Sequence, residues 1–422
     1  MNKSRAKISK NFTSFDLFAG AGGLSYGFSL AGIESIYALE QDKWAGETYA
    51  RNNPKVKLEI RDIRDITDEE IAGIALELPD LIMGGPPCQG FSHANTGNKD
   101  PKDPRNSLFL EFVRFVRIIR PQLCVIENVP GLLRTRLSDG TMAIDAIQEA
   151  FLEIGYDTSW KILNAVDFGV PQKRERLFIV GMRKDLGFTN FSWPETTHQS
   201  IDGKTQIDLF SGQASPANSQ ISLWNAISDL PQIYAEDTLK NLTYSSTPTN
   251  AYQAQMREFS SGLVHNHEPM RHTARINERF RSIGFGQSEA DVPEHLRPRR
   301  RGGNGELSGV VYDQNSRRQH PNAPCNAMVA SSHTNFIHPH LNRNFTVREM
   351  MRIQSFPDHY IVCGKRAVLS KKLSIRKGYT DDVYLDQRAQ IGNAVPPLLA
   401  QAVGLSIRRL LTENFEEKCY AV

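Results

Sequence analysis

The 422-residue sequence contains few cysteines and no long run of uncharged apolar residues. Its five cysteines are an odd, scattered set without a C-x-x-C pair, so they predict neither a disulfide framework nor a cysteine metal site. We therefore expect a reducing, cytoplasmic setting. No stretch of about 18 apolar residues suggests a membrane span. The basic N-terminus also lacks the apolar core of a secretory signal.

The overall composition is ordinary for a soluble globular protein, with 40% hydrophobic and 23% charged residues. At roughly 150 residues per domain, the length predicts two or three domains. The net charge of +3 conceals a basic segment, because residues 271–320 contain ten arginines and six acidic residues. This segment is a candidate nucleic-acid surface, although its composition alone fits a solvated loop equally well.

Short apolar runs alternate with helical patterns through the first 180 or so residues. We expect strands at 13–18, 35–39, 56–60, 81–83, 123–126 and 177–180, with helices at 42–51 and 108–119. This alternation predicts an α/β fold, a doubly wound and mostly parallel sheet with helices on both faces. After about residue 185 the chain becomes polar, which indicates a second, smaller and irregular domain. Helices are expected again at 346–354, with a capping-box spacing, and near the C-terminus, where an apolar stripe runs from Val395 to Leu410.

A glycine-rich motif, FDLFAGAGGL at residues 15–24, follows the first expected strand directly. Glycines at such a turn allow the backbone to approach a ligand closely. Glu40 stands twenty residues after Gly20, at the end of the second strand, where an acid can accept hydrogen bonds from ribose hydroxyls. The spacing is not G-x-G-x-x-G, so the motif alone leaves a nucleoside site and a plain glycine turn about equally open.

Three further motifs lie at or near strand ends. The sequence GGPPCQGFS at 84–92 places Cys88 on a shaped loop, where it is either a nucleophile or an inert small side chain. Glu127, in the ENV sequence, would lie at the same edge, although alone it fits an exposed acid better. Arg174 and Arg176 are two residues apart, so in extended chain they point the same way and could hold a phosphate or a carboxylate. Their alternative is a solvated strand edge.

These four motifs, in this order, resemble the cytosine-5 DNA methyltransferases of the prokaryotic modification-methylase type. Residues 348–358 and 390–397 resemble two later motifs of that family. The resemblance covers about 13–185 and 320–411, and the family's middle segment varies with the DNA sequence read. It implies the S-adenosylmethionine-dependent methyltransferase fold. The implied units are a catalytic domain at 1–185, a target-recognition domain at 186–385, and a C-terminal helix at 386–422 that returns to the catalytic domain.

The resemblance also implies the chemistry. A methyl group would pass from S-adenosylmethionine to C5 of a cytosine flipped out of a specific duplex sequence, through a covalent bond between Cys88 and C6. A protonated Glu127 would donate to N3 of the base, and Arg174 and Arg176 would hold the base in place. The product is S-adenosylhomocysteine, and no metal is implied. Gln41 stands where many members carry an aromatic residue that stacks on adenine, and Trp44 is one helical turn further on.

The remaining expected site residues form two groups. The resemblance assigns cofactor binding to Phe18, Gly20, Gly22, Gly23, Leu24, Glu40, Gln41, Asp62, Ile63, Pro87, Asn393, Ala394 and Val395. The sequence also suggests DNA contacts by Gln89, Ser92, Arg105, Arg297, Arg299, Arg300, Arg301, Arg317 and Arg318.

Duplex DNA is the expected partner, and binding to DNA would place the protein at the nucleoid. A restriction endonuclease of the same specificity is expected to act without direct binding, and a monomer is expected. Two alternatives remain. A transfer-RNA cytosine-5 methyltransferase shares the first motifs, but the 140 or so residues between 184 and 324 favour DNA. A DNA-binding protein with an inactive domain is disfavoured, because every catalytic residue type is present.

Overall fold

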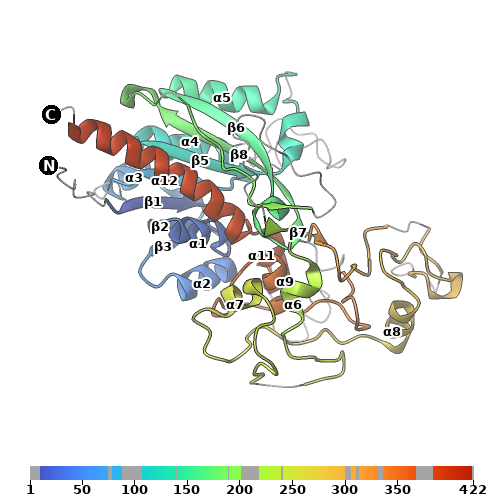
Figure 1. The fold of residues 1–422 in the computed structure, drawn as a ribbon. Coiled ribbons are helices and arrows are strands. Elements are labelled where there is room, and N and C mark those ends of the chain that lie inside the picture. Colours follow the sequence, from blue (N-terminus) through green and yellow to red (C-terminus); the bar gives the residue numbers. More distant parts are fainter. Residues whose placement is uncertain are drawn as a thin grey trace, which may run out of the picture.

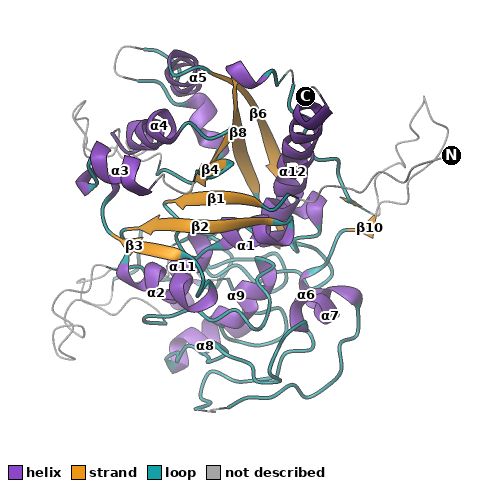
Figure 2. Cartoon of the chain, turned by 90° about the vertical axis from the view of Figure 1, so that its left-hand side faces the viewer, coloured by secondary structure: helices purple, strands orange, loops and turns teal. Residues whose placement is uncertain are grey.

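The computed structural model describes residues 10–74, 78–87, 107–137, 140–188, 190–200, 218–238, 241–299, 306–309, 313–330, 336–366 and 384–420. These residues form a larger body around a sheet and a smaller body of short helices and long loops (Figures 1 and 2). Among the described residues, no helix is both long and apolar enough to cross a membrane.

A seven-stranded sheet organises the larger body, in the order β3-β2-β1-β4-β5-β8-β6. β8 runs antiparallel to both β5 and β6, and the remaining pairs are parallel. The predicted mostly parallel α/β fold is therefore confirmed. The strands are β1 (Phe12–Leu17), β2 (Ile33–Glu40), β3 (Lys57–Ile60), β4 (Leu81–Gly84), β5 (Leu123–Asn128), β6 (Tyr156–Asn164) and β8 (Glu175–Arg183).

Helices cover both faces of the sheet, because its central strands are apolar on both sides. On one face Ile82 packs with α3, α4 and α5, and on the other Leu81 and Met83 pack with α1 and α12. α2 lies beside β2 and β3. The helices are α1 (Gly23–Leu30), α2 (Lys43–Asn52), α3 (Asp68–Ile74), α4 (Ser107–Ile119), α5 (Ala143–Glu153) and α12 (Pro397–Tyr420).

The C-terminal helix α12 lies along the larger body, and its end returns to the neighbourhood of β1 (Figure 1). It packs closely on α1, since a Cβ atom at Gly27 would lie 2.4 Å from the Ala400 side chain. Val403 and Ile407 from its apolar stripe are buried in the same core as Phe28. The helix thus joins the first and last parts of the chain.

The smaller body contains short elements joined by loops. Its helices are α6 (Leu223–Ile227), α7 (Ala251–Arg257), α8 (Ala274–Arg281), α9 (Val347–Ile353) and α11 (Gln387–Asn393). Two-stranded pairs are β9 (His198–Gln199) with β10 (Asn218–Ser219), and β7 (Gln172–Lys173) with β11 (Cys325–Asn326). Short 3-10 helices occur in both bodies: η1 (Ile63–Asp65), η3 (Pro130–Arg134), η4 (Ala165–Phe168), η5 (Lys184–Leu186) and η6 (Glu294–Leu296).

The boundary after residue 185 is not abrupt. Phe191 is buried in the core of the larger body, and Phe188 and Trp193 pack against it. The chain therefore leaves the larger body's core only after about Trp193.

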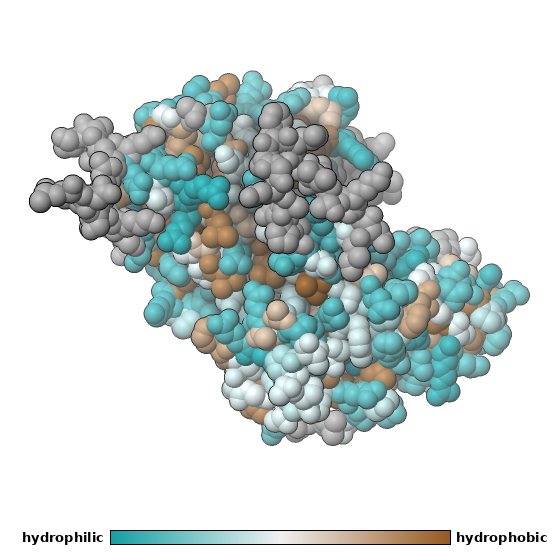
Figure 3. Space-filling model, in the orientation of Figure 1, coloured by the Kyte–Doolittle hydropathy of each residue, from teal (hydrophilic) through white to brown (hydrophobic). Residues whose placement is uncertain are grey.

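On the face seen in Figure 3, hydrophilic side chains prevail and apolar patches gather toward the middle.

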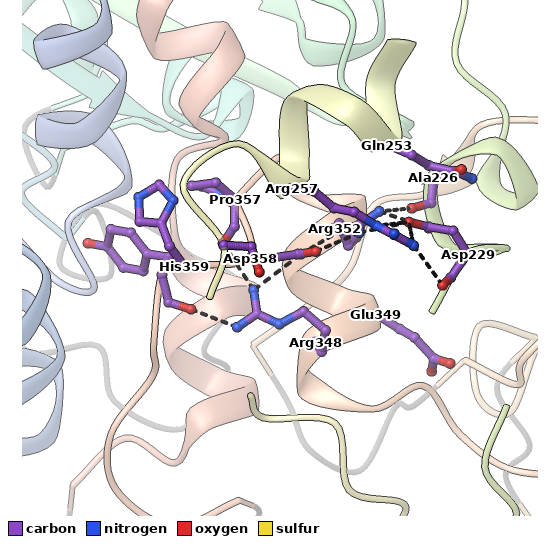
Figure 4. A network of polar contacts seen from close by, with 12 residues as sticks. Ala226, Asp229, Gln253, Arg257, Arg348, Glu349, Arg352, Pro357, Asp358 and His359 are labelled. Atoms are coloured by element: carbon purple, nitrogen blue, oxygen red, sulfur yellow. Dashed lines mark hydrogen bonds and ion pairs between the residues drawn. The ribbon is translucent and has the colours of Figure 1, made fainter. Parts of the chain in front are cut away.

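Buried ion pairs hold α9 in the centre of the smaller body (Figure 4). The Arg352 guanidinium donates to both oxygens of Asp358 at 2.6 Å and to Asp229 at 3.1 Å. Asp229 also accepts from Arg257 at 2.7 Å, and Arg348 donates to the Tyr360 carbonyl at 2.7 Å. Charges buried this deeply are tolerated only when they are paired and hydrogen-bonded. The predicted helix and its capping box are both confirmed here, with Thr346 as the N-cap.

Candidate functional site

A cavity of about 510 Å³ lies at the carboxyl end of the parallel strands. Its volume falls within the range of small-molecule sites, and this edge is where doubly wound sheets bind ligands. It brings together segments that follow β1, β2, β4 and β5 with the turn after α11. The predicted site residues that line it are Phe18, Gly20, Gly23, Leu24, Glu40, Gln41, Ile63, Pro87, Glu127, Arg176, Asn393, Ala394 and Val395.

The glycine-rich turn after β1 forms one wall of the cavity. Gly20 has a φ of +55° and open space beside its Cα, so its backbone faces the cavity unscreened. A Cβ atom at Gly23 would lie 2.2 Å from the Val395 carbonyl oxygen, so glycine lets α1 approach the turn after α11. Gly22 does not line the cavity. A Cβ atom there would lie 2.5 Å from the Tyr360 hydroxyl, which donates to the Ala21 carbonyl at 2.6 Å.

Glu40 is fixed at the end of β2 by two backbone hydrogen bonds. Its carboxylate oxygens accept from the Gly20 and Asp42 amides, each at 2.7 Å. Burial raises its pKa, and the two amides act in the opposite direction. Glu40 lines the cavity, so its remaining lone pairs can accept hydrogen bonds from the hydroxyl groups of a ribose.

Asp16 also lines the cavity, although the sequence argument assigned it no role. Its Oδ2 accepts from the Ser25 hydroxyl, and its buried Oδ1 has no hydrogen-bond partner among the described residues. Burial raises the pKa of Asp16 to about 7. A buried carboxylate oxygen without a partner is costly unless a ligand supplies a donor. The ammonium group of S-adenosylmethionine is such a donor, so this wall fits the predicted cofactor. The only sequence signal was the position of Asp16 inside the glycine-rich motif.

The residues after β3 are arranged differently from the prediction. Ile63 and its neighbour Arg61 line the cavity, whereas Asp62 does not. The Asp62 carboxylate instead accepts from the Arg64 amide at 3.0 Å and caps η1. Trp44 is also absent from the cavity wall, because its ring packs 5.9 Å from that of Tyr384. Gln41 occupies the lining there.

Glu127 and Arg176 meet at the other end of the cavity. Arg176 Nε lies 2.7 Å from Glu127 Oε1. Burial raises the pKa of Glu127, and the charges of Arg176 and Arg174 oppose that shift. Asn128 donates to the Pro86 carbonyl at 3.1 Å, which ties the end of β5 to the proline segment. Cys88 follows that segment in the chain, but it lies outside the described residues.

Comparison with known proteins agrees with this arrangement. Residues 12–409 match the family model for C-5 cytosine-specific DNA methylases. The chain belongs to this methylase family. It is therefore a DNA cytosine-5 methyltransferase, as the motifs predicted.

Individual methylases are similar over nearly the full length. The Type II methyltransferase M.DdeI of Desulfomicrobium norvegicum is 45% identical over 388 residues, which cover 92% of this chain and 86% of that protein. M1.HphI of Haemophilus parahaemolyticus is 33% identical and covers 96% of this chain and 88% of its own. A crystal structure of a prophage-encoded DNA modification methyltransferase (E. coli) shares the fold. Its TM-score is 0.67 at 24% identity, with coverage of 95% of this chain and 99% of that one.

In this methylase Arg174 is placed differently from the prediction of a base-holding side chain. It is buried and does not line the cavity. Its guanidinium donates to the carbonyls of Met328 and Gly392, at 2.7 and 2.6 Å. Alternation does bring Arg174 and Arg176 to the same side, but only Arg176 reaches the cavity.

The arginines predicted to contact DNA fall into different environments. Arg297 and Arg299 are exposed on the methylase surface. Arg317 is half-buried and donates to the Gly286 carbonyl at 2.6 Å. Arg318 is buried and donates to carbonyls of the smaller body, including Ile283 at 2.7 Å, so it is not available to DNA. The predicted contacts Gln89, Ser92, Arg105, Arg300 and Arg301 lie outside the described residues.

Proposed function

We propose that this methylase transfers a methyl group from S-adenosylmethionine to C5 of a cytosine extruded from a specific duplex DNA sequence. The observation that carries the proposal is one cavity whose two ends, formed after β1 and β2 and after β4 and β5, differ chemically. One end holds Glu40 and Asp16, which suit the ribose and the ammonium of the cofactor. The other holds the paired Glu127 and Arg176 beside Pro87, one residue before Cys88.

Cys88 is proposed as the nucleophile. C5 of cytosine reacts poorly because the ring is aromatic, and attack of the Cys88 thiolate on C6 breaks that conjugation. Glu127 donates a proton to N3 as negative charge develops on the ring. The raised pKa of Glu127 supports this role, because the carboxyl must hold a proton to donate it. Arg176 then orients Glu127 and the base.

Bound S-adenosylmethionine supplies an electrophilic methyl group for the activated C5. A base takes the C5 proton, Cys88 leaves C6 as a thiolate, and the N3 proton returns to Glu127, which restores the aromatic ring. The residues at the two ends of the cavity hold the two substrates in one enclosed space, which aligns the reacting atoms. Entry of the base requires its extrusion from the helix, at a cost of a few kcal/mol in lost stacking and pairing.

We further propose that the enzyme works as a cytoplasmic monomer within a restriction–modification system. The similar proteins M.DdeI and M1.HphI carry the name Type II methyltransferase, which supports this setting. A cognate restriction endonuclease would read the same DNA sequence without binding the methylase.

A methyl-transfer assay separates this proposal from its alternatives. The protein is incubated with tritiated S-adenosylmethionine and either mixed-sequence duplex DNA or transfer RNA. Incorporation into the duplex alone is expected, whereas incorporation into transfer RNA alone would favour the RNA enzyme. No incorporation into either substrate, together with tight DNA binding, would favour an inactive DNA-binding protein. Bisulfite sequencing of DNA from cells that express the protein then identifies the target sequence.

A further inference from the structure

Three alternate residues between β7 and the start of β8 form a row that runs from the smaller body to the cavity. Gln172 and Arg174 are buried, and Arg176 lies in the cavity wall. Their spacing of two places their side chains on one side of the extended chain. The row therefore contacts both the part of the chain proposed to read DNA and the part proposed to bind the cofactor.

The first two members of the row bind both backbone polar groups of Met328. Gln172 Oε1 accepts from the Met328 amide at 2.9 Å, and Arg174 Nη1 donates to the Met328 carbonyl at 2.7 Å. These contacts extend the parallel pairing of β7 with β11, in which Cys325 lies opposite Gln172. The side chains of Gln172 and Arg174, just before β8, thus hold the segment that follows β11.

The same two side chains also bind α9 and the end of α11. Arg174 Nη2 donates to the Gly392 carbonyl at 2.6 Å, and Gln172 Nε2 donates to the Ile353 carbonyl at 3.4 Å. Gly392 comes directly before Asn393, which lines the cavity. A Cβ atom at Gly392 would lie 2.6 Å from the Val329 carbonyl oxygen, so the two segments bridged by Arg174 are in direct contact.

Arg174 therefore joins the carbonyl of Met328, in the segment proposed to read DNA, to that of Gly392, which directly precedes the cavity-lining Asn393. A guanidinium is suited to this because its planar fork presents several donors in fixed directions. Rotation of the side chain into the cavity would leave both buried carbonyls without this donor, which disfavours direct contact with the base.

We propose that Arg174 is a positioning residue that couples DNA recognition by the smaller body to cofactor binding in the larger body. This inference rests on the proposed function. Cognate DNA on the smaller body shifts the segment around Met328. Through Arg174, that shift changes the position of Gly392 and of the cavity wall that follows it. Coupling of this kind is reciprocal, so either ligand tightens the binding of the other by the same factor.

The test is a thermodynamic cycle on the full-length protein. Isothermal titration gives the Kd of S-adenosylhomocysteine alone, with a saturating duplex that contains the target sequence found by bisulfite sequencing, and with a scrambled duplex. For the unaltered protein we expect the cognate duplex to tighten binding by a factor in the typical range, roughly 5- to 150-fold. Arg174→Lys keeps the charge but loses the planar fork, and should bring this ratio to within about twofold of one.

Two further variants make the result decisive. Gln172→Met removes both side-chain contacts of Gln172 and should also lower the ratio, and it decides the matter if Arg174→Lys does not fold. Arg318→Lys is the matched control, because Arg318 is a buried arginine bonded to the carbonyls of Ile283 and Phe280, and neither residue adjoins the cavity lining. It should leave the ratio unchanged.

If Arg174 had a merely structural role, its substitution would weaken the binding of S-adenosylhomocysteine equally with and without DNA. An unchanged ratio in folded Arg174→Lys, or in Gln172→Met if Arg174→Lys does not fold, would therefore overturn the inference, and so would a ratio of one in the unaltered protein. Failure of the proposed function is a separate result, in which the unaltered protein neither binds S-adenosylhomocysteine nor methylates any duplex.

Discussion

Arg176 Nε lies 2.7 Å from Glu127 Oε1, and both residues line the cavity together with the proline segment Pro86–Pro87. A Cβ atom at Gly85 would lie 3.1 Å from Glu127 Oε2, so glycine there leaves the carboxyl its space. The carboxyl is held by one cation and otherwise enclosed, which favours its protonated form through burial. This environment suits a group that gives a proton to a bound base.

Glu127→Gln should preserve the shape of the cavity and most of the DNA affinity, but should slow methyl transfer by roughly 10²–10⁴-fold, because the amide cannot transfer a proton. Single-turnover assays and gel-shift titrations measure the two quantities. Glu69→Gln, at an exposed position on α3, is the matched control and should behave as the unaltered protein. Near-normal turnover of Glu127→Gln would remove Glu127 from the mechanism.

Cofactor binding should depend on pH through Asp16. Its pKa of about 7 is raised above the ordinary value, so below pH 7 the carboxyl is mostly protonated and cannot pair with an ammonium. The Kd of S-adenosylhomocysteine should therefore fall as the pH rises from 5.5 toward about 7 and then level off, with at most a tenfold change for each pH unit. Isothermal titration measures this dependence.

Asp16→Asn should bind more weakly and lose the dependence below pH 7. Asp62→Asn is the control, because Asp62 caps η1 outside the cavity, and it should retain the dependence. A pH profile shared by Asp16→Asn and the unaltered protein would contradict the proposed contact.

The ion pairs around α9 should dominate the stability of the smaller body. Arg352→Met removes the principal cation of Asp358 and leaves Asp229 with Arg257 alone, and such a change typically costs about 3–5 kcal/mol in the free energy of unfolding. Arg117→Met breaks an exposed contact with Asp68 and should cost no more than about 1 kcal/mol. Urea denaturation compares the two variants, and equal costs would contradict the assigned importance of Arg352.

Target choice should follow the middle segment of the chain. Because Phe191 and Trp193 pack on the core of the larger body, an exchange of residues 194–322 with a related methylase is less disruptive than one that starts at 185. The exchanged segment carries exposed arginines, including Arg297 and Arg299, of a type suited to read guanine. Bisulfite mapping should show the donor's specificity, and an active chimera with the original specificity would refute this division of roles.

Much of the larger body was predictable because each buried strand is a short apolar run bounded by turn residues. β6 was missed because Trp160 and Ile162 are exposed on an edge strand and give no such signal. Motifs located the cavity, since they end at the same edge of one sheet. They did not separate Arg176 from Arg174, or Arg299 from Arg318. An arginine that donates to buried carbonyls and one that faces solvent have the same sequence signal, and only tertiary contacts distinguish them.

The central claim is a covalent bond between Cys88 and C6 of the target cytosine. Duplex DNA with 5-fluorocytosine at the target position is incubated with the protein and S-adenosylmethionine, and the products are run on a denaturing gel. Fluorine cannot leave C5 as a proton does, so elimination stalls and a protein–DNA complex should survive denaturation. Cys88→Ala should form no such complex, and a denaturation-resistant complex with that variant would contradict the account.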